Sequence, residues 1–300
     1  MTKMEKAIVL INPHSGHGSA ADLQKKLGAL LPDRELEFRD SGTIADWKEF
    51  FASAGGADLV LCGGDGTLNG FINRTDGMTW DGRILYYATG SGNDFLTDIG
   101  GKKGGAPVDV TSCLTDLPDA YVNGQKYKFL NNVSFGIDGY ACEECDRIRA
   151  GRRTGRPVNY TRIALKGMLW AFKPYNAIVT VDGETREYHR VWLAPTMNGR
   201  YFGGGMMIAP GQDRLNPERK LSFVIIHNIS RPVIAILFPA IFGGRHLKYM
   251  KYVAVIEGHE VTVRFDRPCA LQMDGETILG VTEYTAWSVL THQSTEVQAR

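Results

Sequence analysis

The first hundred residues alternate between short apolar runs and longer amphipathic stretches. Runs that are apolar throughout are typical of strands buried on both faces of a parallel sheet, and leucines at helical spacing are typical of a helix that covers one face. The pattern predicts four strands, Ala7–Ile11, Glu35–Phe38, Asp58–Cys62 and Ile84–Ala88. It predicts two helices between them, Ala20–Leu31 and Ala45–Ala54. We therefore expect a doubly wound α/β domain over residues 1–125.

From about Asp109 the pattern changes to short segments rich in β-branched and aromatic residues. The predicted strands are Ala177–Val181, Arg190–Leu193, Phe223–Ile226, Val253–Ile256 and Val261–Phe265. Two helices are predicted among them, Tyr160–Phe172 and Pro232–Phe242. Turn signals such as Asp182-Gly183 separate some strands, so we expect a largely antiparallel second domain over residues 126–285. The fold class is thus α/β plus β.

Glycine clusters follow the third and fourth predicted strands. Gly63-Gly-Asp-Gly-Thr67 comes directly after Cys62, and Gly90-Ser-Gly-Asn-Asp94 comes shortly after Ala88. Glycines let main-chain N–H groups approach an anion without obstructing side chains. The alternative for the first cluster is a simple tight turn, and the alternative for the second is a turn with an Asn or Asp helix N-cap. Because ligands of parallel α/β sheets bind at the carboxyl ends of the strands, the clusters predict one phosphate-binding edge.

Asn12-Pro-His-Ser-Gly16 closes the first strand in a similar way, and its Ser15 and Gly16 offer hydrogen-bond donors. Within Gly63–Thr67, Asp65 is a candidate for holding Mg²⁺ or orienting a hydroxyl, and Thr67 for donating to a phosphate oxygen. The chain has no P-loop lysine motif, no Gly-x-Gly-x-x-Gly after a strand and no Gly-x-Ser-x-Gly. Phosphate binding would therefore rely on glycine N–H groups.

The tripeptide Asp-Gly-Glu occurs twice, as Asp274-Gly-Glu276 and Asp182-Gly-Glu184. Asp-Gly is among the strongest short-range signals for a β-hairpin, so local pattern favours a turn at both places. Nothing local distinguishes Glu276 from Glu184. The glycine-rich segment Asn198–Met206 favours a closely packed corner of the second domain, and a wall of a substrate cleft is the alternative.

Composition and charge limit the classes of function that this chain can have. The net charge of +1 gives no general argument for nucleic-acid binding. The most apolar stretch, Pro232–Gly244, is too short to span a bilayer, and no secretory signal precedes the first strand. Five cysteines without framework spacing fit a reducing compartment, and Cys142 and Cys145 favour a helical i,i+3 pair over half a metal site. We expect a cytoplasmic protein.

Taken together, these segments resemble the bacterial diacylglycerol kinase and YegS-like lipid kinase family, which is related to sphingosine kinases. That family carries Asn-Pro-x-Ser-Gly, Gly-Gly-Asp-Gly-Thr, Gly-Ser/Thr-x-Asn-Asp and a late Asp-Gly-Glu, and this chain has all four in that order. Ser134-Phe-Gly-Ile-Asp138 is similar to the family's Gly-x-Gly-x-Asp. The resemblance implies an α/β domain like that of NAD kinases and phosphofructokinases, a C-terminal β-sandwich, and a return of residues 286–300 to the first domain.

The resemblance also implies roles for individual residues. The nucleotide ATP would be bound by Asn12, Ser15, Gly16, Gly63, Gly64, Asp65, Gly66, Thr67, Gly90, Ser91, Gly92 and Asn93. Asp65 and Asp94 would bind the phosphates of ATP through Mg²⁺. Glu276 would be the base that accepts the proton of the attacking hydroxyl. The implied catalytic residues are therefore Asp65, Asp94 and Glu276. Ser41 or Thr43 would replace a threonine that family members carry after the second strand.

Three departures from the family pattern matter. Gly70 stands where a glutamate is usual, and Thr97 stands where an arginine is usual. The segment that binds a structural Mg²⁺ in relatives, Asp-Asp-Gly-x-Leu-Asp, is Pro217-Glu-Arg-Lys-Leu-Ser222 here. Only Asp213 and Glu218 remain nearby as carboxylate ligands for that second metal, so we expect this site to be weakened or lost.

The implied substrate is a lipid, so the protein would contact membranes transiently. The basic cluster Arg147, Arg149, Arg152, Arg153 and Arg156, followed by apolar residues, is a candidate for docking on anionic lipid; a solvated basic loop is the alternative. Two other functions stay open: an NAD-kinase-like enzyme acting on a soluble substrate, and a non-catalytic lipid or nucleotide sensor. We expect no nucleic-acid partner, and a homodimer stays open.

Overall fold

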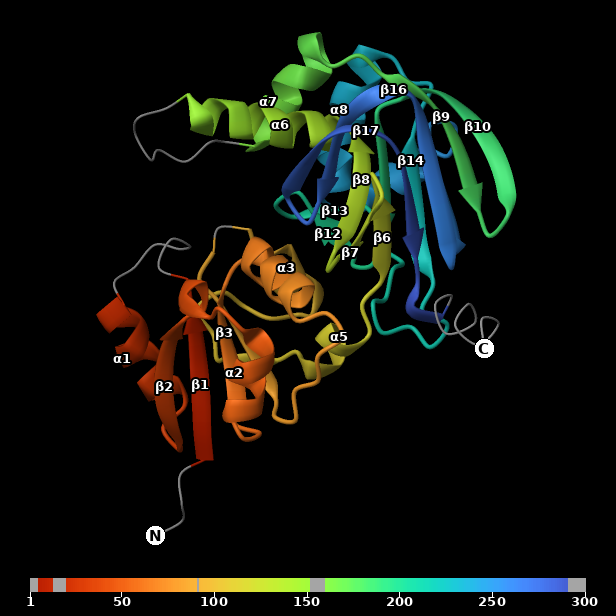
Figure 1. Cartoon of the computed structure of the whole chain (residues 1–300). Helices are drawn as coiled ribbons and strands as arrows, with labels where there is room; N and C mark the ends of the chain where they lie inside the picture. Colours follow the sequence, from red (N-terminus) through yellow and green to blue (C-terminus); the bar gives the residue numbers. More distant parts are fainter. Residues whose placement is uncertain (1–4, 13–19, 91, 152–159, 291–300) are drawn as a thin grey trace, which may run out of the picture. The chain divides into compact units, whose positions relative to one another are not determined.

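The computed structural model describes residues 5–12, 20–90, 92–151 and 160–290. The chain forms two compact units, of which the first ends at Asp116 and the second begins at Leu117. Figure 1 shows the helices and strands of both units, coloured along the sequence.

The first unit contains a five-stranded sheet in the order β2-β1-β3-β4-β5. Its strands are β1 (Glu5–Ile11), β2 (Arg34–Asp40), β3 (Asp58–Gly63), β4 (Ile84–Ala88) and β5 (Val108–Asp109). Its helices are α1 (Ala20–Leu30), the 3₁₀ turn η1 (Ser41–Thr43), α2 (Trp47–Ser53), α3 (Asp65–Arg74), α4 (Asp94–Asp98) and α5 (Thr111–Thr115). Strands β1 to β4 are parallel and only β5 is antiparallel, which confirms the predicted α/β fold.

Alternate residues of the central strands face different helices. Val9 and Val60 pack with Leu27 of α1 on one face. Trp47 of α2 and Phe71 of α3 meet edge to face, with ring centroids 5.7 Å apart. The sheet is therefore covered on both sides, as its uninterrupted apolar strands require.

The second unit is mostly antiparallel. Its strands are β6 (Asp119–Val122), β7 (Gln125–Lys128), β8 (Asn132–Gly136), β9 (Tyr175–Val181), β10 (Glu184–Val191), β11 (Leu193–Met197), β12 (Tyr201–Phe202), β13 (Met206–Met207), β14 (Leu221–Ile226), β15 (Val253–Gly258), β16 (Glu260–Met273) and β17 (Glu276–Trp287). The main sheet follows the order β15-β14-β11-β8-β16-β17-β6-β7, and the β9–β10 hairpin joins it through β16. The predicted β-sandwich is thereby confirmed.

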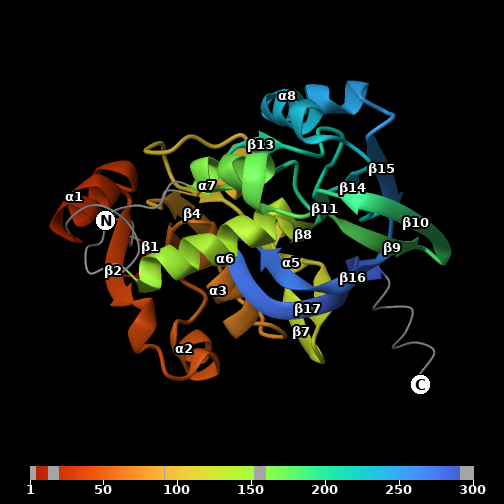
Figure 2. The same ribbon diagram turned by 90° about the horizontal axis from the view of Figure 1, so that it is seen from above.

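Five further helical segments belong to this unit, namely α6 (Ile137–Ala150), α7 (Tyr160–Lys166), the π-turn η2 (Gly167–Ala171), α8 (Arg231–Ile241) and the 3₁₀ turn η3 (Arg245–Lys248). Helix α6 contacts both α7 and the β16–β17 ribbon (Figure 2). The helical pair expected at Cys142 and Cys145 is confirmed on this helix, although its full extent was not predicted.

One predicted strand needs correction. The predicted strand Arg190–Leu193 is divided, because Arg190 has a positive φ of 54° and Trp192 separates β10 from β11. Asn198–Met206 forms the small β12–β13 hairpin, with three consecutive glycines at positive φ in its turn.

No helix among the described residues is long and apolar enough to cross a membrane.

Residues 286–300 were predicted to return to the first domain, and the structure describes residues 286–290 of this segment. Ala286 and Trp287 are part of β17 and pair with Ala120 and Asp119 of β6 in the second unit. Residues 291–300 lie outside the described part of the chain.

Candidate active site

The glycine clusters after β3 and β4 are in direct backbone contact. A Cβ atom on Gly90 would lie 2.5 Å from the Cα atom of Gly64, and one on Gly64 would lie 2.8 Å from the carbonyl oxygen of Gly92. The N–H groups of Thr89 and Gly90 both donate to the carbonyl of Gly63, at 2.9 and 3.1 Å. Glycine is therefore required here for close approach of two loops, which brings the predicted phosphate-binding segments together.

Asp65 links the two loops through its carboxylate. Its Oδ2 accepts the N–H of Asp94 at 2.7 Å, and its Oδ1 accepts the N–H of Phe95 at 3.2 Å. These are the first two residues of α4, whose N-terminal N–H groups have no partner within the helix. Asp65 is only 8% exposed. Its observed contacts thus fix the second loop against the first.

Asp94 begins α4 and is also buried, at 7% exposure. Two acidic side chains, Asp65 and Asp94, thus stand in the first turns of α3 and α4. Mg²⁺ is commonly held by one or two carboxylates together with substrate phosphates, and both side chains are of this chemical type. Asn93 supports the same loop by donating to the carbonyl of Gly90 at 3.0 Å.

A lysine outside the motifs reaches the second loop. Lys103 Nζ donates to the carbonyl oxygen of Gly90 at 2.7 Å. The position at which the family usually carries an arginine is Thr97, whose hydroxyl donates to the carbonyl of Asn93. A cation is therefore present at this loop, although sequence reasoning missed it because it lies in a loop with no recognisable spacing.

A cavity of about 100 Å³ gathers several predicted residues of the first unit. Its polar lining includes Asn12, Ser41 and Thr67, and its apolar lining comes from Leu10, Trp47, Leu61 and Phe71. Ser41 rather than Thr43 lines it, because the Thr43 hydroxyl donates back to the carbonyl of Asp40. Arg74, one turn after Gly70 on α3, also lines the cavity and was missed. The predicted Ser15, Gly16 and Ser91 lie outside the described residues.

In the second unit, Asp274-Gly275 is a two-residue hairpin turn. Met273 pairs with Glu276 across it, and both turn residues have positive φ, 49° and 91°. The Asp274 carboxylate accepts the N–H groups of Asn131 and Asn132, at 2.7 and 3.1 Å, and that of Leu130. The hairpin predicted from local pattern is confirmed, and it is anchored on a segment more than 140 residues away in sequence.

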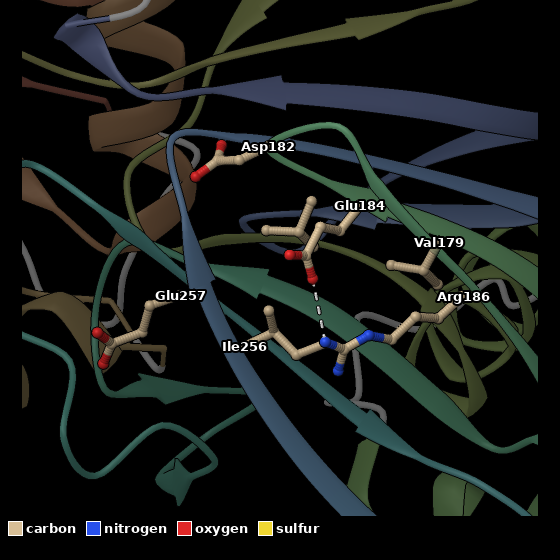
Figure 3. Close-up of a pocket in the computed structure, with 7 residues that line it drawn as sticks. Val179, Asp182, Glu184, Arg186, Ile256 and Glu257 are labelled. Atoms are coloured by element: carbon tan, nitrogen blue, oxygen red, sulfur yellow. Dashed lines mark hydrogen bonds and ion pairs between the residues drawn. The ribbon is translucent and has the colours of Figure 1, made fainter.

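The second Asp-Gly-Glu hairpin shows what distinguishes the two glutamates. Asp182 also accepts main-chain N–H groups, those of His259 and Glu260, both at 2.8 Å. Glu184, however, pairs with Arg186 at 3.2 Å in a cavity of about 240 Å³ (Figure 3). Among the described residues the side chain of Glu276 makes no hydrogen bond or ion pair, and its main chain pairs with Met273. Its carboxylate is exposed and available as a proton acceptor.

The loop before β14 does not offer ligands for the structural Mg²⁺ that the resemblance implies. Glu218 pairs with Lys220, and this hydrogen bond lowers the pKa of Glu218. Asp213 Oδ1 accepts the N–H of Leu215 at 2.9 Å. The Asn216 amide closes the loop by donating to the carbonyl oxygens of Asp213 and Lys220. These residues do not fit a carboxylate-rich metal site, and the described residues contain no group of three or more metal-binding side chains.

Asp138 is a buried carboxylate in the first turn of α6. It is 1% exposed, and its Oδ2 atom has no hydrogen-bond partner. Burial raises its pKa to about 6, which hydrogen bonds from Ser134 and the Gly139 N–H only partly offset. The sequence singled out its motif but gave no sign of this burial. A buried carboxylate with one oxygen lacking a partner is more common at functional sites than in ordinary cores.

Comparisons with known proteins identify the family. The diacylglycerol kinase catalytic domain matches residues 6–118, and the YegS C-terminal NAD kinase beta sandwich-like domain matches residues 131–288. The chain belongs to the diacylglycerol kinase and YegS-like lipid kinase family.

Similar proteins match most of the chain. It is 25% identical to the Bacillus subtilis protein named "Putative lipid kinase YtlR", over 92% of this chain and 94% of that protein. It is 27% identical to a diacylglycerol kinase of Mycobacterium tuberculosis, over 81% of this chain and 80% of that one. A crystal structure of a diacylglycerol kinase from Bacillus anthracis shares the fold, with a TM-score of 0.60, 16% identity and 96% of each chain covered. Membership in this kinase family implies use of a nucleotide.

Proposed function

We propose that this lipid kinase family member transfers the γ-phosphate of ATP to a lipid hydroxyl, with diacylglycerol or a related lipid as the acceptor. The observation that carries the proposal is the junction of the two glycine loops, locked by Asp65 to the start of α4. Phosphoryl transfer needs positioning and charge neutralisation rather than covalent help from the protein. Main-chain N–H groups on rigid, closely packed loops meet that need without reorganisation.

The residues have separate tasks in this proposal. Asn12, Ser41 and Thr67 bind the nucleoside side of ATP and its phosphates, as their common cavity suggests. Asp65 and Asp94 would hold Mg²⁺, which neutralises phosphate charge when bound. The exposed Glu276 accepts the proton of the attacking hydroxyl.

A panel assay tests this function. Purified protein is offered labelled ATP with diacylglycerol, other lipid alcohols and NAD, alongside the Asp65→Ala variant. We expect label in a lipid product with the wild type, and none with Asp65→Ala because α4 loses its anchor. Labelling of NAD alone would favour the NAD-kinase-like alternative, and ATP binding without any product would favour a sensor.

We further propose that the protein docks reversibly on anionic membranes through α7–η2 and α8–η3. Two described members of the predicted basic cluster, Arg147 and Arg149, are paired with Glu144 and Asp146 on α6, so they are weaker candidates for lipid contact. By contrast, residues 219–256 contain no acidic side chain. Exposed apolar side chains on this part of the unit are Leu165, Trp170, Ile236, Phe242, Tyr249 and Met250.

The two segments adjoin each other. Arg231 at the start of α8 donates to the carbonyl oxygens of Met168 and Phe172, at 2.6 and 2.8 Å. Trp170 is 73% and Met250 83% exposed. Large exposed apolar side chains among basic ones match the interface of an anionic bilayer.

Charge removal at Lys248 of η3 and at the nearby Lys251 tests the docking surface. Each basic residue near an anionic surface contributes about 1 kcal/mol, so Lys248→Gln with Lys251→Gln should weaken binding to phosphatidylglycerol vesicles about 30-fold. Vesicle co-sedimentation at fixed salt measures this. Leu279→Ser is the control, since Leu279 is 60% exposed but lies between Glu276 and Glu283. Equal vesicle binding by the lysine variant and the wild type would contradict the proposal.

A further inference from the structure

Arg214 is a buried arginine in the loop between β13 and β14, only 7% exposed. Its Nη1 donates to the carbonyl oxygen of Leu130 at 3.2 Å, and its Nη2 donates to Asn131 Oδ1 at 3.0 Å. Asn198 Nδ2 donates to the same Leu130 carbonyl at 3.0 Å. A guanidinium is costly to bury unless acceptors face its donors. These hydrogen bonds therefore hold Arg214 and residues 130–131 in fixed positions relative to each other.

The N–H groups of the same segment converge on Asp274. All three N–H groups of Leu130, Asn131 and Asn132 donate to its carboxylate, and the Asp274 N–H donates back to the carbonyl of Asn132 at 3.1 Å. A buried anion thus holds the N–H groups of residues 130–132, and a buried cation holds the Leu130 carbonyl. Charge-assisted hydrogen bonds of this kind are stronger than neutral ones, so each ion favours the peptide orientation that the other requires.

We propose that Arg214 is a positioning residue for Glu276. Asp274 is the first residue of the two-residue turn that Glu276 follows, so a shift of residues 130–132 moves the hairpin that presents Glu276. The inference rests on the proposed function, in which Glu276 accepts the hydroxyl proton. A displacement of about 1 Å at a reacting group can cost about 10²-fold in rate.

Arg214 gives this loop a cation that cannot be lost. Its neighbours Asp213 and Glu218 are turned to local contacts, and Arg219 donates to the carbonyl of Arg214 at 3.1 Å. Arginine stays charged at every pH at which proteins are stable. In this chain, therefore, a fixed guanidinium rather than a divalent metal organises the loop that supports the Asp274 hairpin.

A double-mutant cycle tests the proposal. Lipid kinase activity is measured for the wild type, Arg214→Met, Glu276→Gln and the double variant, with kcat and KM for ATP determined separately. We expect Arg214→Met to lower kcat about 10- to 100-fold in the wild type, with KM for ATP changed little. In the Glu276→Gln background the same substitution should change kcat less than about twofold, because residues acting through one another are non-additive.

Two further variants keep the result interpretable. Arg214→Lys retains the charge and is expected to recover part of kcat, and it replaces Arg214→Met in the cycle if that variant does not fold. Arg267→Met is the matched control, since Arg267 also donates to two carbonyl oxygens, those of Lys173 and Pro174, at 3.0 and 3.1 Å. It should leave kcat unchanged.

The outcomes separate the two proposals. Equal loss from Arg214→Met in both backgrounds, or no loss at all while Glu276→Gln is impaired, overturns the positioning role. Normal turnover in Glu276→Gln overturns instead the role of Glu276 in the proposed function, and with it any positioning by Arg214. Both proposals are supported if Arg214→Met lowers kcat about 10- to 100-fold in the otherwise wild-type protein and less than about twofold in the Glu276→Gln background.

Discussion

Replacing Glu276 by glutamine is expected to lower turnover about 10²–10⁴-fold, the usual contribution of a positioned general base. Glutamine keeps the size of the side chain and removes the proton-accepting carboxylate. Because the side chain of Glu276 makes no hydrogen bond or ion pair among the described residues, the substitution breaks no side-chain contact and leaves the main-chain pairing with Met273 in place. ATP binding and the midpoint of thermal unfolding should therefore stay unchanged. Initial rates with labelled ATP and diacylglycerol, and calorimetric ATP titrations, measure these quantities.

Glu184→Gln is the matched control for that experiment. Glu184 occupies the same place after an Asp-Gly turn, but its carboxylate pairs with Arg186 at the surface (Figure 3). Turnover by Glu184→Gln should equal that of the wild type, since exposed ion pairs contribute little. Wild-type turnover by Glu276→Gln would remove Glu276 from the mechanism, and equal impairment of both variants would show that the loss is not specific to the proposed base.

Replacing Gly90 by alanine is expected to destabilise the first unit by about 1–3 kcal/mol, the cost of an extra methyl group in a closely packed place. The new Cβ would lie 2.5 Å from Gly64 Cα and 2.8 Å from Gly64 N. Both are backbone atoms and cannot rotate away, so the two loops must separate. Separation strains the contact of Asp65 with α4, and ATP affinity should fall together with stability. Urea denaturation and calorimetric ATP titration measure the two effects.

Gly92→Ala provides the comparison within the same loop. A Cβ at Gly92 would meet nothing closer than Asp65 Oδ2, at 3.7 Å, which is ordinary van der Waals contact. Its free energy of unfolding should lie within about 0.5 kcal/mol of the wild type. If Gly90→Ala proves as stable as Gly92→Ala, the close packing of the two loops is not what requires glycine at position 90.

The predictions that succeeded rest on interactions between near neighbours in sequence. The buried strands were recognisable because both faces of each are apolar, and β1, β3 and β4 lie where Ala7–Ile11, Asp58–Cys62 and Ile84–Ala88 were expected. The Asp274-Gly275 turn was recognisable because the type of turn depends on two residues that tolerate positive φ. The divided strand at Arg190 was missed because its irregular backbone follows from packing rather than from residue type.

Family membership was also contained in the sequence, since the order of the motifs specifies it. The sequence by itself thus determined the α/β and β-sandwich classes, the glycine loops and the candidate residues. Only the tertiary structure decided what those residues contact. Asp65 accepts hydrogen bonds from residues 29 and 30 positions away in the sequence. Asp274 accepts hydrogen bonds from residues more than 140 positions away, and Arg214 donates hydrogen bonds to residues more than 80 positions away. Hydrogen bonds and burial depend on which groups meet in space. The tripeptide Asp-Gly-Glu is the same at both hairpins, and the structure shows that Glu184 pairs with Arg186 whereas the side chain of Glu276 has no such partner among the described residues.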